Sequence, residues 1–228
     1  MRSSHKATVL DNEEPEDVVF KFILVGDTGV GKSSILLKYT EDKFDQDHNV
    51  TVGVDFRSKN IKIEDKALIK LQVWDTAGQE TFGSIVRSFY RDAAAIFLVY
   101  DVKSRDTFEG VKTWLEEVQS NSDTEPIYIL IGNQADSQDR QVTYDEGVEF
   151  MKQHDLSFFF ETSAFNGTNI DMAFFEAAQL CYVKYSRSKM NQSNARSSMN
   201  LKDHNRPGQR LTVDKAKKEK KEKSSNCC

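Results

Sequence analysis

Apolar residues fall along the chain in two patterns, one typical of strands and one typical of helices. Short apolar runs with the length of a buried strand each end in glycine or polar residues. They are residues 18–26, 93–101, 127–133 and 156–163. Between them, residues 107–118 and 169–185 place apolar side chains three and four positions apart, as amphipathic helices do. Strand and helix in repeated alternation predict a parallel sheet with helices on both faces.

One pair of segments departs from this alternation. Residues 54–65 and 66–76 both alternate apolar and polar side chains around a charged turn, which predicts an antiparallel hairpin. The predicted fold class is therefore α/β, with a six-stranded, mostly parallel sheet that has one antiparallel edge strand.

Composition divides the chain of 228 residues into three regions. Residues 1–17 are polar and acidic and are expected to form a disordered arm. Residues 18–186 carry the apolar pattern and are expected to form one domain. Residues 187–228 have little apolar surface to offset the entropy of ordering, so we expect a disordered tail.

Charge is distributed unevenly between these regions. The net charge is −5, yet the residues from Lys184 onward include 13 Lys and Arg against four Asp and Glu. A basic tail on an acidic body indicates an anionic surface as its partner. The three cysteines, Cys181, Cys227 and Cys228, exclude a disulfide scaffold. Without an apolar leader or a membrane-length apolar run, the chain is expected in the cytosol.

The first apolar run leads into "GDTGVGKSS", residues 26–34, which we call the phosphate loop. It fits the pattern G-x-x-x-x-G-K-[ST], whose glycines let backbone N–H groups surround phosphate oxygens at the start of a helix. Lys32 can reach the β- and γ-phosphates, and the Ser33 hydroxyl can ligate Mg²⁺. The loop predicts a nucleoside triphosphate as ligand and does not indicate the base.

Two further segments supply candidate groups for the same site. In "WDTAGQE", Asp75 ends an apolar strand and can support Mg²⁺. Gly78 can bring a backbone N–H to the γ-phosphate, and Gln79 can orient a water molecule. Thr51 lies on the loop before the predicted edge strand and offers a hydroxyl as a second Mg²⁺ ligand.

The motifs "GDTGVGKSS", "TVGVDF", "WDTAGQE", "NQAD" and "ETSA" follow one another in the order and at the spacing of the small Ras-like GTPases. Residues 18–186 resemble that family. "VGVDF", "WDTAGQE", the later "FYR" and the terminal Cys-Cys are similar to its Rab branch in particular. The resemblance implies a switch that binds GTP or GDP with Mg²⁺ and hydrolyses GTP.

The resemblance also implies roles for single residues. The phosphates would be surrounded by Gly29, Val30, Gly31, Lys32, Ser33 and Ser34. Ser33 and Thr51 would ligate Mg²⁺, with Asp75 behind them. Gly78 would sense the γ-phosphate, and Gln79 would position the attacking water.

The implied reaction is in-line attack of water on the γ-phosphate, which needs positioning by Gln79 and charge neutralisation by Lys32. No arginine is placed to act in cis, so slow turnover is expected until an activating protein supplies one. Phe56, Trp74 and Phe89 match an aromatic trio that effectors contact in Rab proteins; ordinary core packing is the alternative. An exchange factor is the remaining implied regulator.

The base-binding segments depart from the family patterns Asn-Lys-x-Asp and Ser-Ala-Lys. Asn133 and Asp136 are retained, and the Asp136 carboxylate can accept from guanine N1–H and the 2-amino group, donors that adenine lacks. Ser163 and Ala164 are retained, and the Ala164 N–H would meet the guanine oxygen. Guanine is therefore expected to be preferred over adenine.

Gln134 and Phe165 stand where the family has lysines whose stems flank the base. Phe44 matches an aromatic residue that packs against the base. The flat Gln134 amide and the Phe165 ring could compensate for the missing stems. Alternatively, the loss of the lysine's charge-assisted contact to the phosphate loop, worth about 1.5–3 kcal/mol, weakens nucleotide binding. Our hypothesis is a guanine-specific site with faster nucleotide release.

The terminal "SSNCC" follows the basic run at residues 215–223. Such a pair is geranylgeranylated in Rab-like proteins, so the resemblance implies lipidation of Cys227 and Cys228, which would anchor the chain stably to an anionic membrane. We expect the protein on the cytoplasmic face of an intracellular membrane, with a cytosolic pool and a role in vesicle traffic. Prenylation and membrane-extraction machinery would be partners, and nucleic acid would not.

Two other functions remain open at this stage. A scaffold that keeps the fold without hydrolysis is supported only by Gln134 and Phe165. An ATP-using enzyme of the same loop type, such as a small-molecule kinase, is opposed by Asp136 and by the lack of a substrate lid.

Overall fold

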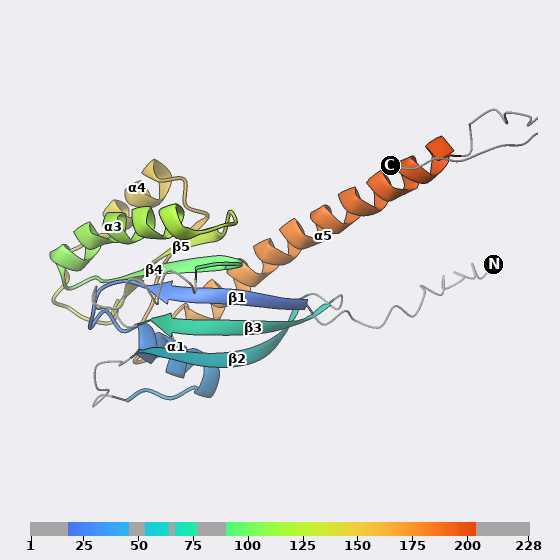
Figure 1. The fold of residues 1–228 in the computed structure, drawn as a ribbon. Coiled ribbons are helices and arrows are strands. Elements are labelled where there is room, and N and C mark those ends of the chain that lie inside the picture. Colours follow the sequence, from blue (N-terminus) through green and yellow to red (C-terminus); the bar gives the residue numbers. More distant parts are fainter. Residues whose placement is uncertain (1–17, 46–52, 64–66, 77–89, 204–228) are drawn as a thin grey trace, which may run out of the picture. The chain divides into compact units, whose positions relative to one another are not determined.

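The computed structural model describes four stretches of the chain (Figure 1), namely residues 18–45, 53–63, 67–76 and 90–203. The chain divides into two units, residues 1–186 and residues 187–228. The elements, in chain order, are β1 (Val18–Val25), α1 (Lys32–Glu41), β2 (Val54–Ile63), β3 (Ala67–Thr76), β4 (Ala95–Asp101), α3 (Arg105–Asn121), β5 (Ile127–Asn133), α4 (Tyr144–Gln153), β6 (Phe158–Glu161) and α5 (Ile170–Asp203).

The described strands form one six-stranded sheet in the order β2-β3-β1-β4-β5-β6. Strand β2 pairs antiparallel with β3, while every other neighbouring pair is parallel. This confirms the predicted α/β class with one antiparallel edge strand. The chain crosses from β3 back over β1 to β4, so the carboxyl ends of β1, β3 and β4 lie at one edge of the sheet, where ligands bind in open α/β folds.

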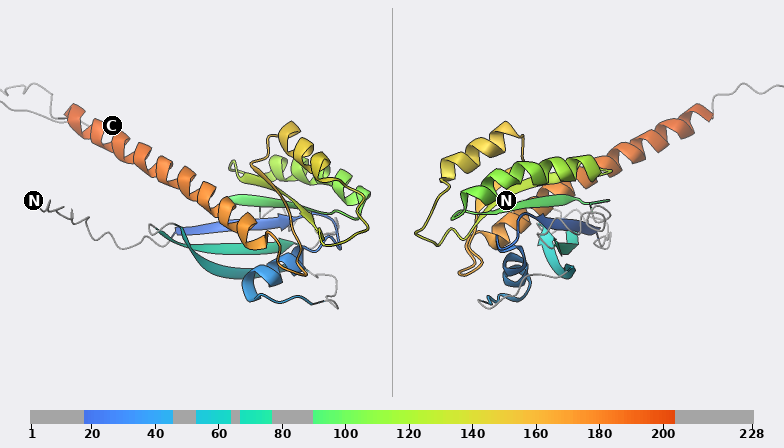
Figure 2. Two further views of the ribbon diagram at one scale, coloured as in Figure 1. Left: turned by 180° about the vertical axis from the view of Figure 1, so that it is seen from behind. Right: turned by 60° about the vertical axis from the view of Figure 1, so that its left-hand side comes forward.

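Helices cover both faces of the sheet, as predicted. Strand β1 sends Phe22 and Leu24 into a core shared with α1 and α5, and Ile23 and Val25 into a second core shared with α3 and α4. Figures 1 and 2 show α1 on one face and α3 with α4 on the other. Because both faces are buried, the parallel strands read as continuous apolar runs.

Phe174 joins α5 to the first core. Its ring stacks on Tyr39 of α1 with centroids 3.9 Å apart and on Phe97 of β4 with centroids 4.7 Å apart. Such aromatic pairs stabilise the fold by about 0.5–1.5 kcal/mol more than the burial of their apolar area alone. The buried face predicted for this helix is confirmed, and Cys181 is buried within it.

Helix α5 continues to Asp203, beyond the point where the sequence composition predicted an ordered chain to end. Residues 187–203 contain no glycine or proline, and several have high helix propensity. A helix nucleated by its packed first turns can extend through such a segment, because propagation costs less than nucleation. The predicted arm, residues 1–17, and the rest of the tail, residues 204–228, lie outside the described residues. No helix within the described residues is long and apolar enough to cross a membrane.

Candidate functional site

The phosphate loop connects the end of β1 to the start of α1, at the carboxyl edge of the sheet. Gly26 and Gly31 have positive φ angles of 145° and 93°. A Cβ on Gly26 would lie 2.1 Å from the Val99 carbonyl oxygen, and one on Gly31 would lie 2.4 Å from the Asn133 amide nitrogen. Both positions therefore require glycine. Among the described residues, no side chain caps the N-terminus of α1, and the first turn of this helix has no acidic residue, which suits an anion there.

Lys32 is buried beneath this loop, only 5% exposed. Its Nζ donates to the backbone oxygens of Gly26 at 2.7 Å and Asp27 at 2.8 Å. Burial lowers the pKa of Lys32 to about 8, although the charges of Asp75 and Asp27 act in the opposite direction. The loop thus holds an ammonium group among its own carbonyls, where phosphate oxygens would meet it.

Ser33 and Asp75 come together from α1 and β3. The Ser33 hydroxyl donates to Asp75 Oδ2. Asp75 is fully buried and pairs with Leu24 in the β1–β3 register, so its carboxylate lies beside the end of β1. A hydroxyl and a carboxylate are hard oxygen donors that suit Mg²⁺, which keeps several waters and phosphate oxygens as its other ligands. The donor set here therefore fits that metal.

Asn133 holds the phosphate loop in place. Its Nδ2 donates to the Val30 carbonyl at 2.9 Å, and its Oδ1 accepts from the Thr162 hydroxyl at 3.2 Å. The side chain is 1% exposed, so it lies inside the protein. Asn133 therefore connects three segments: the phosphate loop, the end of β5 and the segment after β6.

Gln134 adopts a left-handed backbone conformation, with φ 64°. Its Nε2 donates to Asp101 Oδ2 at 2.8 Å, at the end of β4. Burial raises the pKa of Asp101, against the opposing effect of Lys103. The Gln134 amide is therefore bound to Asp101. The sequence suggested that this amide could lie along the base and did not predict Asp101 as its partner. Asp136 is exposed, which leaves its carboxylate accessible to a ligand.

Two aromatic residues predicted at the base lie together although they are far apart in sequence. Phe44, after α1, and Phe165, after β6, have ring centroids 5.5 Å apart at an angle of 85°. Both rings are partly accessible, at 38% and 57% exposed. The neighbouring Ser163 and Ala164 are buried, and the Ser163 hydroxyl oxygen accepts the Asn166 N–H at 3.2 Å. The Ser163 side chain thus shapes its own loop.

The β2–β3 hairpin presents part of the predicted effector surface. Phe56 lies opposite Trp74 in the antiparallel register, and their ring centroids are 4.8 Å apart. Phe56 is 44% exposed, so core packing does not account for it, whereas Trp74 is partly buried against the second core. Other predicted residues lie outside the described residues, namely Thr51, Gly78, Gln79, Phe89, Cys227 and Cys228.

Sequence reasoning missed several residues that support the site. They are Asp101 and Thr162, described above, and a pair formed by Asp27 of the phosphate loop and Trp114 of α3, whose Nε1 donates to Asp27 Oδ1 at 2.7 Å. Asp101 and Trp114 belong to no local motif. Asp27 and Thr162 lie within quoted motifs, yet each meets its partner only through the fold. Among these residues, only Trp114 is indicated by a sequence pattern, because the apolar periodicity of α3 places it on the face toward the sheet.

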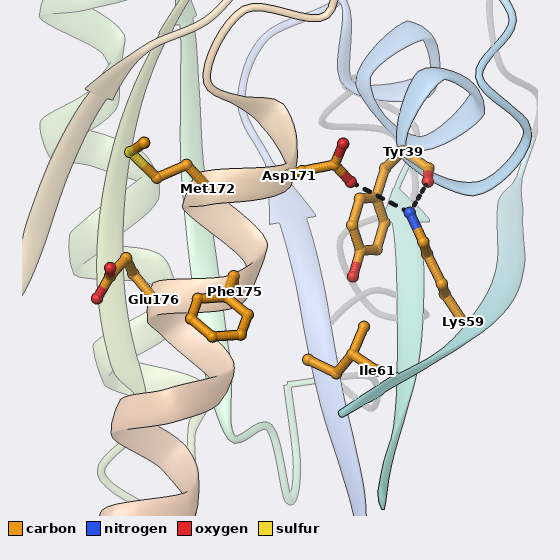
Figure 3. A pocket seen from close by; sticks show the side chains of 7 residues that line it. All are labelled: Tyr39, Lys59, Ile61, Asp171, Met172, Phe175 and Glu176. Atoms are coloured by element: carbon orange, nitrogen blue, oxygen red, sulfur yellow. Dashed lines mark hydrogen bonds and ion pairs between the residues drawn. The ribbon is translucent and has the colours of Figure 1, made fainter. Parts of the chain in front are cut away.

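A pocket of about 420 Å³ lies between α1, β2 and α5 (Figure 3). It is lined by Tyr39, Lys59, Ile61, Asp171, Met172, Phe175 and Glu176. Lys59 Nζ already donates to the Tyr39 carbonyl at 2.7 Å and to Asp171 Oδ1 at 3.1 Å. None of these residues belongs to the phosphate loop, and Lys59 is already ion-paired with Asp171, so we assign no phosphate to this pocket.

A glycine-rich loop between the first strand and helix of a parallel sheet, with a buried lysine beneath it, defines a P-loop nucleotide-binding protein. The comparison with known families narrows this class. The model of the Ras family matches residues 21–183, and the chain belongs to that family. It is thus a small Ras-like GTPase. Members bind GTP or GDP, typically with Mg²⁺, and act as switches that interact with exchange factors, activating proteins and effectors.

Proposed function

We propose that this small GTPase is a Rab-type switch, anchored by lipid to an intracellular membrane, that regulates vesicle traffic through effectors bound in its GTP state. The observation that carries the nucleotide-binding part is the cluster of Lys32, Ser33 and Asp75 at the carboxyl ends of β1 and β3. A buried ammonium next to a hydroxyl–carboxylate pair suits a phosphate chain that carries a metal ion.

The phosphate end of the nucleotide would be held by the phosphate loop. Backbone N–H groups from Gly29 to Ser34 would donate to the phosphate oxygens, and Lys32 would neutralise charge on the β- and γ-phosphates. Ser33 and Thr51 are the proposed Mg²⁺ ligands, with Asp75 behind them. Bound there, Mg²⁺ would neutralise charge on the β- and γ-phosphate oxygens.

The base end would be read by Asp136, whose exposed carboxylate accepts from guanine N1–H and the 2-amino group. The Ala164 N–H would donate to the guanine oxygen. Phe44 and Phe165 would pack on the base, a role supported by their partial exposure and mutual contact. The Gln134 amide is bound to Asp101, so the Phe165 ring would contribute more than Gln134 to the packing that the missing lysine stems provide.

Hydrolysis would proceed by attack of a water molecule that Gln79 orients. We assign no arginine of this chain to the γ-phosphate. We therefore propose that intrinsic turnover is slow and that an activating protein accelerates it. Loops carrying Thr51 and Gly78 would respond to the γ-phosphate and so report the nucleotide state to effectors. Phe56, Trp74 and Phe89 would be the aromatic contact for those effectors.

Single-turnover hydrolysis tests the enzymatic part of this proposal. Protein loaded with γ-labelled GTP is mixed with Mg²⁺, and released phosphate is followed over time. Wild type should release phosphate in one slow exponential phase, and Gln79→Leu should be at least about tenfold slower, because the leucine cannot orient water. Equal rates in both proteins would remove Gln79 from the mechanism. No release from GTP-loaded wild type would favour a scaffold.

Vesicle binding tests the anchor. Full-length chain is treated with geranylgeranyl transferase and floated with vesicles that contain phosphatidylserine. Two lipid chains anchor a protein stably and one chain only marginally. Wild type should therefore float, Cys228→Ser should float weakly, and the variant that lacks both Cys227 and Cys228 should stay in solution. Equal flotation of all three would contradict the proposed lipidation.

A further inference from the structure

The phosphate loop carries a carboxylate, on Asp27, beside the site proposed for phosphates. A negative charge there repels phosphate oxyanions unless it is held away from them. Asp27 is partly buried, and its backbone oxygen accepts from Lys32 Nζ at 2.8 Å. The position of Asp27 therefore affects both the charge that the phosphates meet and the place of the lysine that binds them.

Helix α3 provides a binding position for this carboxylate. Trp114 Nε1 donates to Asp27 Oδ1 at 2.7 Å. Gly110, one helical turn earlier, faces the same carboxylate, because a Cβ at that position would lie 3.0 Å from Asp27 Oδ2. Residues four apart share one face of a helix. Trp114 thus supplies the hydrogen-bond donor, and Gly110 supplies the space.

The direction of this contact separates the carboxylate from the phosphates. Helix α3 packs on one face of the sheet, whereas α1, whose N-terminus follows the phosphate loop, packs on the other. The hydrogen bond to Trp114 draws the Asp27 side chain toward the α3 face. Glycine inside a helix is less favourable than alanine, and here its lack of a side chain leaves room for Asp27.

We propose that Trp114 and Gly110 form an anchor on α3 that positions the Asp27 carboxylate away from the phosphates and thereby sets the lifetime of the bound nucleotide. They are positioning residues, since neither touches the nucleotide. The inference rests on the proposed function, because it requires a guanine nucleotide at the phosphate loop.

The test measures dissociation of fluorescent GDP and GMP analogues from wild type and Trp114→Phe, each with and without Asp27→Asn. Trp114→Phe removes the donor and releases the carboxylate. GDP release should accelerate about tenfold, the effect of losing one hydrogen bond to a charged group. In the Asp27→Asn background, the acceleration should fall below about twofold, since no charge is released. GMP, with one phosphate fewer, should respond less than GDP, and added salt should shrink the effect.

A second variant keeps the proposal testable if Trp114→Phe folds poorly. Gly110→Ala should favour helix α3, yet its Cβ would lie 3.0 Å from Asp27 Oδ2, so the carboxylate must shift by a few tenths of an ångström. GDP release should therefore accelerate measurably while the thermal unfolding midpoint does not fall. Release from Gly110→Ala as slow as from wild type overturns the anchor. So does an equal effect of Trp114→Phe in both Asp27 backgrounds. If wild type retains no GDP at all, the proposed function itself fails, which is a distinct result.

Discussion

The buried ammonium of Lys32 makes nucleotide binding depend on pH. Burial holds its pKa at about 8, opposed by Asp75 and Asp27. Phosphate oxyanions placed against this group favour its charged form and raise its pKa. Nucleotide binding should therefore take up a proton wherever Lys32 is partly neutral. Affinity should be highest below pH 8 and fall as the pH rises above it.

Calorimetry of GDP binding in buffers of different ionisation enthalpy measures this proton uptake. We expect about half a proton per nucleotide at pH 8, where half of the Lys32 side chains are neutral before binding. The uptake should grow between about pH 7.5 and pH 8.5. Binding enthalpies that do not depend on the buffer over this range would contradict the role of Lys32.

Substitution of Gln134 tests whether Gln134 and Phe165, which stand where the family has lysines, weaken nucleotide binding. Its amide donates to Asp101 Oδ2 at 2.8 Å, so the amide is held at the end of β4. Gln134→Lys should slow GDP release about tenfold, because it restores a charged contact worth about 1.5 kcal/mol or more. Phe165→Lys is the matched variant on the opposite loop.

Dissociation of a fluorescent GDP analogue gives the result directly. If Gln134→Lys releases GDP at the wild-type rate, then Gln134 and the Phe165 ring together compensate fully for the missing lysine stems. The hypothesis of faster release would then be wrong, and an exchange factor would set the timing of the switch.

At the scale of elements, α4 starts with a capping box that also contacts α3. Glu146 Oε2 accepts the Thr143 N–H at 2.9 Å, and Arg105 of α3 pairs with Glu146 Oε1 at 2.6 Å. The hydrogen bond from Arg105, followed by those from Thr143, lowers the pKa of Glu146 to about 2. Because the folded pKa lies below the ordinary value, this stabilisation is present above about pH 4.5. It is lost as the pH falls toward 2.

Urea unfolding between pH 7 and pH 3 tests this contact. Glu146→Gln should lower stability at pH 7 and flatten the decline on acidification, because the lowered pKa is removed. Glu149→Gln, an exposed position on the same helix, is the control and should keep the wild-type slope. The same slope in wild type and Glu146→Gln would contradict the role of this carboxylate.

The elements that the sequence predicted correctly have a local pattern. Continuous apolar runs indicated the parallel strands, and alternation indicated the β2–β3 hairpin. The extension of α5 to Asp203 has no such pattern. Its low apolar content predicts disorder, whereas helix propensity and nucleation by the packed first turns account for the helix.

At the scale of the whole molecule, the phosphate loop was predictable because its residues are contiguous. The contacts that hold it were not. Asn133 reaches the Val30 carbonyl across 103 positions, and Trp114 reaches Asp27 across 87. Such pairs are formed by strand order and helix packing, which a single sequence does not encode as local patterns. Gln134 shows the consequence, because its partner Asp101 could be found only from the fold.

We propose above all that the site of this Ras-family protein selects guanine through Asp136. Competition of GDP, ADP and xanthosine diphosphate for wild type and Asp136→Asn tests it most directly. Wild type should bind GDP at least about a thousandfold more tightly than ADP, because ADP leaves a charged acceptor unpaired. Asp136→Asn should lose GDP and gain xanthosine diphosphate, since an amide offers the donor that the xanthine 2-oxygen accepts. Equal affinity of wild type for GDP and ADP, or an unchanged preference in Asp136→Asn, would contradict the account.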